Sequence, residues 1–228
     1  MLGGVVVWIV GDATIKGSET GTSFKQALWA KECGFNLHDT MIWRKTNPLP
    51  QTKVGRRYTL SFEYMFVFSK GLVKTFNPLM EKTKYFGKKY KPALQRYADG
   101  TKSLLRRERQ SENRYNEYKQ LSNVWDVSSV NTNLIGHPAS FPKNLAESHI
   151  LSWTNPGDLV LDPFCGSGTT ALACKELNRN YICIEKEKEY FDIACDRLSQ
   201  PREYSEEEET IKPVGEVEFK QLSLFDIA

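Results

Sequence analysis

The chain has 228 residues, enough for one large domain or two small ones that bury about 70% of the unfolded surface. Hydrophobic residues make up 40% and charged residues 26%, which excludes a chain that is disordered or fibrous throughout. No apolar run is long enough for a membrane span. Five cysteines without a CxxC pair indicate reduced thiols in the cytoplasm, and no metal-ligand spacing is present.

Four segments ahead of residue 74 have the patterns of strands and a helix. The apolar run 5–10 ends at Gly11 and is typical of a buried parallel strand. Residues 23–34 have apolar side chains at helical spacing, and Gly34 is a stop signal. Segments 36–45 and 63–71 are predicted to be two further strands.

Positive charge is concentrated in the middle of the chain. Residues 74–124 hold 13 Lys and Arg against 5 Asp and Glu, so this segment has a charge of +8 in a chain of net charge +3. Seven Phe and Tyr residues are interspersed there, and one helix is predicted around 104–121. The stretch 44–57 adds five cations and no acid. Cations beside aromatic rings suit a nucleic-acid surface; the alternative is a solvated basic face.

Residues 155–198 alternate between strand and helix. Strands are predicted at 159–162 and 181–185, and helices at 169–177 and 189–198. Such a βαβα unit implies a parallel sheet covered by helices, and hence an α/β fold. The last 27 residues, 202–228, hold 3 basic and 8 acidic residues and are expected to form a flexible tail.

A glycine-rich turn lies inside that unit. Gly166, Gly168 and Ala171 match G-x-G-x-x-G/A between a strand and a helix, where small residues let a ligand approach the backbone. Glu185 ends the next strand 23 residues after Asp162, where a carboxylate can accept hydrogen bonds from ribose hydroxyls. Two other interpretations are open. The segment can be a tight turn without a ligand, with Glu185 as a surface acid, or it can bind a nicotinamide cofactor.

Two segments resemble those of the amino-group DNA methyltransferases. These are DPFCGSGTT (162–170) and, ahead of it, GHPASFPKNLAESHI (136–150). The family transfers methyl from S-adenosylmethionine to N6 of adenine or N4 of cytosine. The resemblance implies a Rossmann-like sheet, mostly parallel with one antiparallel strand, and an inserted target-recognition region. The motif order resembles the β arrangement of this family, and the resemblance covers residues 1–73 and 124–198.

The resemblance also implies site residues and domains. The cofactor would be lined by Asp162, Pro163, Phe164, Gly166, Ser167, Gly168, Thr169, Glu185, His137, Pro138, Ala139, Phe141 and Pro142. DNA would be bound by Arg44, Lys45, Lys53, Arg56, Arg57, Lys88, Lys89, Arg106 and Arg107. The expected domains are a catalytic half at 1–73, the recognition region at 74–124, the cofactor half at 125–200 and the tail at 201–228.

The catalytic element of the family has no match in this sequence. That element is an Asp, Asn or Ser followed by two prolines and an aromatic residue, but none of the ten prolines here are adjacent. Asn47 and Pro48 begin the sequence most similar to this element, but they lack the second proline and the aromatic residue. They also follow a different strand from the one that precedes the catalytic element in the β arrangement. Because residues 1–4 resemble the turn that opens the next strand, the catalytic strand is expected before residue 1. A late start or split reading frame, a partner chain that supplies the strand, and an inactive protein all fit.

The C-terminal peptide QLSLF resembles a bacterial sliding-clamp binding motif. Leu222, Leu224 and Phe225 would fill an apolar pocket while Gln221 makes polar contacts beside it. Docking of this peptide as a strand on the protein's own sheet is the alternative interpretation.

The leading hypothesis is a site-specific DNA methyltransferase that binds S-adenosylmethionine and double-stranded DNA. It would act in the cytoplasm, at the nucleoid, as part of a restriction-modification, phage or mobile-element system. The alternative is a non-catalytic remnant that binds DNA, cofactor or clamp. Methylation of protein or RNA is a distant third reading. The base methylated and the recognition sequence are open at this point.

Overall fold

The computed structural model describes residues 3–48, 57–89, 94–104, 116–129 and 141–200. Described residues before 79 and from 122 onward belong to a larger compact unit, and those from 79 to 121 belong to a smaller one. None of the helices in these ranges has the length and apolar character of a transmembrane span.

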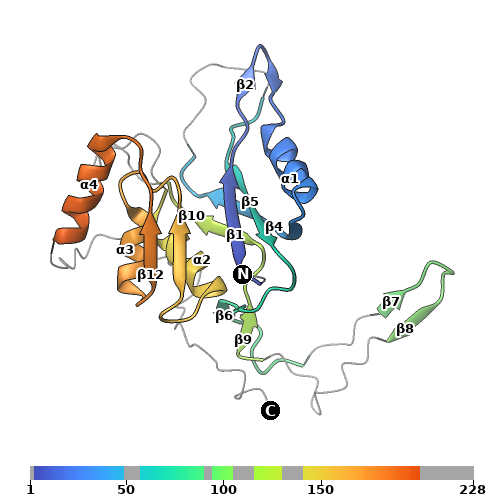
Figure 1. Ribbon diagram of the computed structural model, residues 1–228. Helices are drawn as coiled ribbons and strands as arrows, with labels where there is room; N and C mark the ends of the chain where they lie inside the picture. The colour runs from blue at the N-terminus through green and yellow to red at the C-terminus, as the bar shows by residue number, and fades with distance from the viewer. Residues whose placement is uncertain (1–2, 49–56, 90–93, 105–115, 130–140, 201–228) are drawn as a thin grey trace. The chain divides into compact units, whose positions relative to one another are not determined.

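The larger unit contains a four-stranded sheet (Figure 1). Its strands are β1 (Val5–Val10), β4 (Asn36–Lys45), β5 (Phe62–Ser69) and β10 (Val124–Val127). They are ordered β1-β5-β4-β10, with β5 antiparallel to both of its neighbours and β10 parallel to β4. Met65 and Val67 on one face of β5 and Phe66 and Phe68 on the other are all buried, which explains the apolar run of residues 65–68.

A second sheet in the same unit is made of two parallel strands, β11 (Leu159–Asp162) and β12 (Asn180–Cys183). The two sheets thus contain one antiparallel strand, β5, among otherwise parallel pairings. This confirms the predicted mostly parallel α/β sheet with one antiparallel strand.

Four helices cover these sheets: α1 (Thr22–Glu32), α2 (Lys143–Trp153), α3 (Thr169–Glu176) and α4 (Lys188–Ser199). Ala27 of α1 packs on Phe66 and Phe68, on one face of the four-stranded sheet. On the other face, the Nε2 atom of His149 in α2 lies 3.2 Å from the Sδ atom of Met65.

Helix α2 also packs against the second sheet. Ala146 and Ile150 form a buried cluster with Ala173 and Cys174 of α3, and Val160 of β11 packs against it. Helix α2 therefore contacts both sheets, through His149 in one case and through Ala146 and Ile150 in the other.

Each sheet ends in a strand edge that has no partner among the described residues. Strand β1 pairs only with β5, and β11 pairs only with β12. The edge-to-face contact of Trp8 in β1 with Phe164, just after β11, has a centroid distance of 6.4 Å. The free edges of β1 and β11 therefore belong to neighbouring parts of one unit.

Three two-stranded ribbons complete the described structure. They are β2 (Thr14–Ile15) with β3 (Ser18–Glu19), β6 (Met80–Lys82) with β9 (Tyr118–Gln120), and β7 (Leu94–Arg96) with β8 (Lys102–Leu104). The helix predicted around 104–121 is wrong at both described ends, because residue 104 belongs to β8 and 118–120 belong to β9. Cross-strand pairing replaces the expected helical contacts there; residues 105–115 lie outside the described ranges.

His149 provides a test of the packing that joins α2 to the four-stranded sheet. Burial lowers the pKa of its imidazole from 6.5 to about 3. Below pH 6.5 the unfolded chain binds a proton at this ring that the folded chain does not bind. The free energy of unfolding should therefore fall as pH drops from 6.5 toward 3, by about 2 kcal/mol at pH 5.

We predict that His149→Gln removes this part of the pH dependence, as measured by urea unfolding at pH 7 and pH 5. The matched control is His38→Gln, because His38 is exposed and the control should keep the wild-type dependence. Equal pH dependence in wild type and His149→Gln would contradict the assignment.

Candidate cofactor-binding site

The predicted glycine turn lies at the carboxyl ends of two adjacent parallel strands. Asp162 is the last residue of β11 and is paired in register with Cys183, the last residue of β12. Positive φ angles of 51° at Gly166 and 81° at Gly168 form the turn that leads into α3. Ligands of open α/β sheets bind at this edge.

The carboxylate of Asp162 spans the turn. Its Oδ1 atom accepts the backbone N–H of Phe164 at 3.0 Å, and its Oδ2 atom accepts the hydroxyl of Thr170 at 2.5 Å. Helix α3 begins after Gly168 without a side-chain cap. Thr170 ties the first turn of α3 to the end of β11.

Glu185 holds the turn from the second strand. Its Oε2 atom accepts the backbone N–H of Gly166 at 2.8 Å, and its Oε1 atom accepts that of Glu187 at 2.9 Å. Glu185 lies two residues beyond the end of β12 rather than within it. The turn therefore has two carboxylates in fixed orientations, a charge distribution suited to a cationic ligand with ribose hydroxyls.

Helix α4 packs against the same turn and forms hydrogen bonds with it. Arg197 donates through Nη1 to the carbonyl of Ser167 at 2.5 Å and to its hydroxyl at 3.1 Å. A Cβ atom at Gly168 would lie 2.9 Å from the Cβ atom of Ala194. Arg197 is 30 residues from Ser167, and no sequence signal linked the two.

Three cysteines lie in or near the turn: Cys165 within it, Cys174 in α3 and Cys183 at the end of β12. Burial raises the pKa of Cys165, that of Cys174 to about 11 and that of Cys183 to about 12, so these groups are neutral at pH 7. Within the described ranges, no group of three or more His, Cys, Asp or Glu side chains is placed to hold a metal ion.

Of the second motif, 136–150, the structure describes residues 141–150. Pro142 is buried and immediately precedes α2, and Phe141 packs on the cluster formed by α2 and α3. His137, Pro138 and Ala139 lie outside the described residues. Phe164 is 73% exposed, so its ring is accessible beside the turn.

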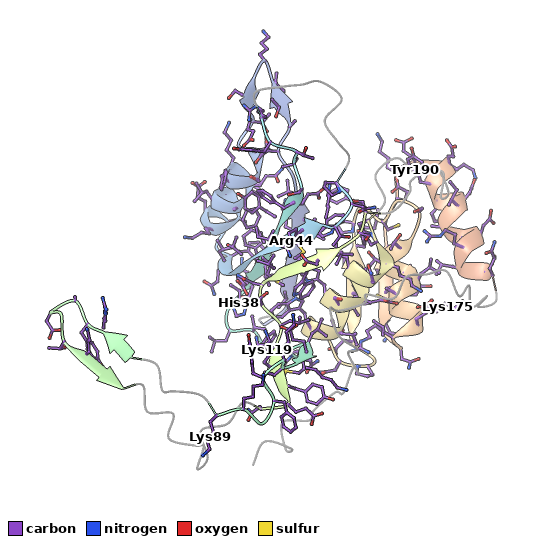
Figure 2. The ribbon with its side chains drawn as sticks, turned by 180° about the vertical axis from the view of Figure 1, so that it is seen from behind. His38, Arg44, Lys89, Lys119, Lys175 and Tyr190 are labelled. Carbon is purple, nitrogen blue, oxygen red and sulfur yellow. The ribbon has the colours of Figure 1, made fainter. Side chains whose placement is uncertain are left out.

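The three predicted DNA-binding cations that the structure describes in the larger unit are paired with acids of the same chain. Arg44 pairs with Asp126 (Figure 2 labels Arg44). Lys45 pairs with Glu63 at 2.5 Å, and Arg57 with Glu19 at 3.0 Å. These acidic partners neutralise part of the positive charge that the sequence alone suggests is available to bind DNA.

The remaining predicted DNA-binding residues divide into two groups. Lys88 lies over the ring of Tyr85 at 5.5 Å, and Lys89 is exposed. Lys53, Arg56, Arg106 and Arg107 lie outside the described ranges, as do the predicted clamp-binding residues Gln221, Leu222, Leu224 and Phe225.

Asn47 has a structural role in this arrangement. Its amide accepts the N–H of Ser129 at 2.6 Å and donates to the carbonyl of the same residue at 3.2 Å. These bonds join the ends of β4 and β10, and β5 separates β4 from the free edge of β1. Asn47 and Pro48 are therefore not placed beside the turn that follows β11.

Comparison with known proteins agrees with this geometry. Residues 1–196 match the model of the N6/N4 methyltransferase family, described as DNA methylase. The orphan methyltransferase M.BamHII of Bacillus amyloliquefaciens is 50% identical over 204 residues, which are 86% of this chain and 75% of that protein. The crystal structure of the M1.HpyAVI–SAM complex has a TM-score of 0.56 at 31% identity, covering 88% of this chain and 76% of that one.

The chain therefore belongs to the N6/N4 DNA methylase family. Its fold is that of the S-adenosylmethionine-dependent DNA methyltransferases, and S-adenosylmethionine is the cofactor of the family. The type II methyltransferase M.Cfr9I of Citrobacter freundii is 33% identical over 180 residues, which are 78% of this chain but 49% of that protein. The chain thus spans three quarters of one curated relative and about half of another.

Two glycines with similar backbone angles isolate the contact between the turn and α4. Gly168 has φ +81° and Gly157 has φ +85°, but a Cβ atom at Gly157 would meet no heavy atom within 4 Å. We predict that Gly157→Ala lowers the free energy of unfolding by about 1 kcal/mol from backbone strain alone. Gly168→Ala should cost about 1–3 kcal/mol more because α4 must move. Urea unfolding measures both, and equal losses would contradict the contact.

Proposed function

We propose that the turn 162–170 and Glu185 bind S-adenosylmethionine, and that the chain takes part in methyl transfer to N6 of adenine or N4 of cytosine in double-stranded DNA. The observation that supports this most directly is the placement of Asp162 and Glu185. Both carboxylates are held by backbone N–H groups at the carboxyl edge of β11 and β12. The cofactor supplies a methyl group on a positively charged sulfonium.

The residues of the chain itself have separable tasks in this proposal. Glu185 accepts hydrogen bonds from the ribose hydroxyls, and the small residues Gly166 and Gly168 admit the cofactor close to the backbone. The segment 136–142 closes the methionine side. Arg197 keeps the carbonyl of Ser167 turned toward α4, which fixes the path of the turn.

The recognition region is the proposed DNA-binding part of the chain. Its charge of +8 over residues 74–124 favours a polyanionic partner. The domain limits 1–73, 74–124, 125–200 and 201–228, the location at the nucleoid and the clamp-binding role of QLSLF remain predictions.

We further propose that a strand bearing the catalytic loop docks between β1 and β11, supplied by an upstream segment or by another chain. Among the described residues, no strand pairs with the outer edge of β1 or of β11, so these edges offer backbone donors and acceptors to an added strand. The family's Pro-Pro-aromatic element does not occur in this sequence, so a docked strand would have to supply it.

An uncovered apolar surface supports the same proposal. Val160 of β11 faces the cluster at α2, so by alternation Leu159 and Leu161 face the opposite side. Leu159, Leu161, Ile182 and Ile184 are 50–60% exposed. Parallel sheets are normally covered on both faces, so the docked strand is expected to come with a helix that covers these side chains.

The second candidate is a non-catalytic remnant that binds DNA, cofactor or clamp. The missing Pro-Pro-aromatic element favours it. It is distinguished by intact cofactor binding with no methyl transfer even after a catalytic segment is added.

The cofactor assignment is tested by isothermal titration calorimetry with S-adenosylmethionine. We predict that Asp162→Ala abolishes detectable binding, because the turn loses its internal tie. Glu185→Gln should weaken binding about 10- to 100-fold, because charge-assisted hydrogen bonds contribute about 1.5–3 kcal/mol.

Glu187→Gln is the matched control, because the Glu187 side chain is exposed and only its backbone N–H contacts Glu185. The control should bind as wild type. Unchanged affinity in Asp162→Ala or in Glu185→Gln would rule out the proposed site.

The uncovered face is tested by two neighbouring substitutions on β11. Leu159→Glu should change the free energy of unfolding by less than about 0.5 kcal/mol, because the side chain is exposed. Val160→Glu should cost more than about 3 kcal/mol, because it places a charge against the apolar cluster. A large loss from Leu159→Glu would show that another part of this chain already covers the face.

A further inference from the structure

The smaller unit contains two ribbons that differ in the charges of their directly opposed residues: one ribbon pairs opposite charges and the other pairs like charges. In the β6–β9 ribbon, Glu81 lies directly opposite Lys119, and the two side chains form an ion pair at 2.7 Å (Figure 2 labels Lys119). In the β7–β8 ribbon, Arg96 lies directly opposite Lys102. One ribbon therefore neutralises its central charges, and the other places two cations side by side.

Like charges directly opposite each other destabilise a pair of strands. Arg96 and Lys102 are both exposed, and neither has an acidic partner in the part of the chain that the structure describes. Asp99 is the one acid in the sequence 94–104. Its carboxylate accepts the N–H of Thr101 at 2.9 Å and its hydroxyl at 2.6 Å, so it stabilises the turn instead.

The turn of this ribbon is stabilised by hydrogen bonds within residues 97–101. Tyr97 donates its N–H to the carbonyl of Thr101 at 3.0 Å, and Gly100, with φ +82°, donates to the carbonyl of Tyr97 at 3.0 Å. The ring of Tyr97 is exposed next to Arg96. Two cations and an aromatic ring therefore project from a ribbon with a defined tip.

These cations differ from the three described cations of the larger unit that were predicted to bind DNA. Arg44, Lys45 and Arg57 each have an acidic partner within the chain. The unpaired charge at Arg96 and Lys102 is stabilised when an external anion lies between or beside the two side chains. A DNA backbone presents such anions at regular intervals.

We propose that the β7–β8 ribbon is a DNA-contacting element of this methylase and that Arg96 and Lys102 bind DNA from one face of it. Directly paired residues share a face of the ribbon, so the two cations reach the same stretch of duplex. A two-stranded ribbon fits the major groove of B-form DNA, which is about 12 Å wide. This inference rests on the proposed DNA-binding function of the recognition region.

The test is the salt dependence of binding to duplex DNA, measured by fluorescence anisotropy with the full chain. Arg96→Gln and Lys102→Gln should each weaken binding and reduce the slope of log K against log salt by about 0.9, the effect of one phosphate contact. Neither variant should lower Tm, because each removes a repulsive cross-strand pair.

Lys119→Gln is the matched control, because it removes the same charge from the neutralised ribbon. Its slope should equal that of wild type. A pool of random duplexes then separates two kinds of contact: equal weakening on all sequences indicates phosphates, and an altered sequence preference indicates base edges.

Wild-type affinity and slope in both Arg96→Gln and Lys102→Gln would overturn the proposal. The same is true if Lys119→Gln reduces the slope as much as they do, since the effect would then be one of net charge. A wild-type chain that binds S-adenosylmethionine but no DNA would instead contradict the proposed function of the recognition region.

Discussion

The packing of α2 is the constraint on which the arrangement of the larger unit depends. The described residues provide no hydrogen-bonded pairing between β1 and β11, so the two sheets are held together through side chains. His149 of α2 contacts Met65 of β5 and lies 4.6 Å, between ring centroids, from Trp125 of β10. Ala146 and Ile150 of the same helix pack on α3. The position of the cofactor turn relative to the four-stranded sheet therefore depends on one helix and on the contact of Trp8 with Phe164.

The distribution of ion pairs separates structural cations from available ones. Arg44, Lys45 and Arg57 look like one basic surface in the sequence, yet each is paired with an acid at least 18 residues away in the chain. Their charge helps to hold β4, β10 and the β2–β3 ribbon in place. Arg96 and Lys102, which the sequence did not single out, have no such partner among the described residues.

Much of the larger unit is predictable from local patterns. Strands 5–10 and 36–45 match β1 and β4 in position, because apolar runs ended by turn residues are sufficient to define their limits. The expectation that 5–10 is a buried parallel strand is wrong, because β1 pairs antiparallel with β5 and its residues are only partly buried or exposed. The βαβα unit of residues 155–198 is also confirmed, and the glycine turn is where its motif predicts. The assignment to the methylase family followed from that turn and from the segment before it.

Other features depend on contacts that a sequence does not display. The β2–β3 turn is formed by Lys16 with φ +49° and Gly17 with φ +81°; Gly17 is a turn signal, but Lys16 is not a residue that favours a positive φ. Helix α2 overlaps a segment in which the sequence shows only a family motif. Strand β9 forms at residues 118–120, where the sequence predicts a helix. The bracing of Ser167 by Arg197 joins residues 30 positions apart. The catalytic group could not be predicted, because no residue pattern in the chain matches it.

We propose that this chain is the cofactor-binding and DNA-binding part of a methylase whose sheet, in the described residues, is open between β1 and β11. The most direct test is transfer of labelled methyl from S-adenosylmethionine to mixed-sequence duplex DNA by this chain alone, with mass spectrometry of the nucleosides. We predict that folded, cofactor-binding protein gives no product until a segment with the catalytic strand is added. N6-methyladenine or N4-methylcytosine formed by the chain alone would contradict it.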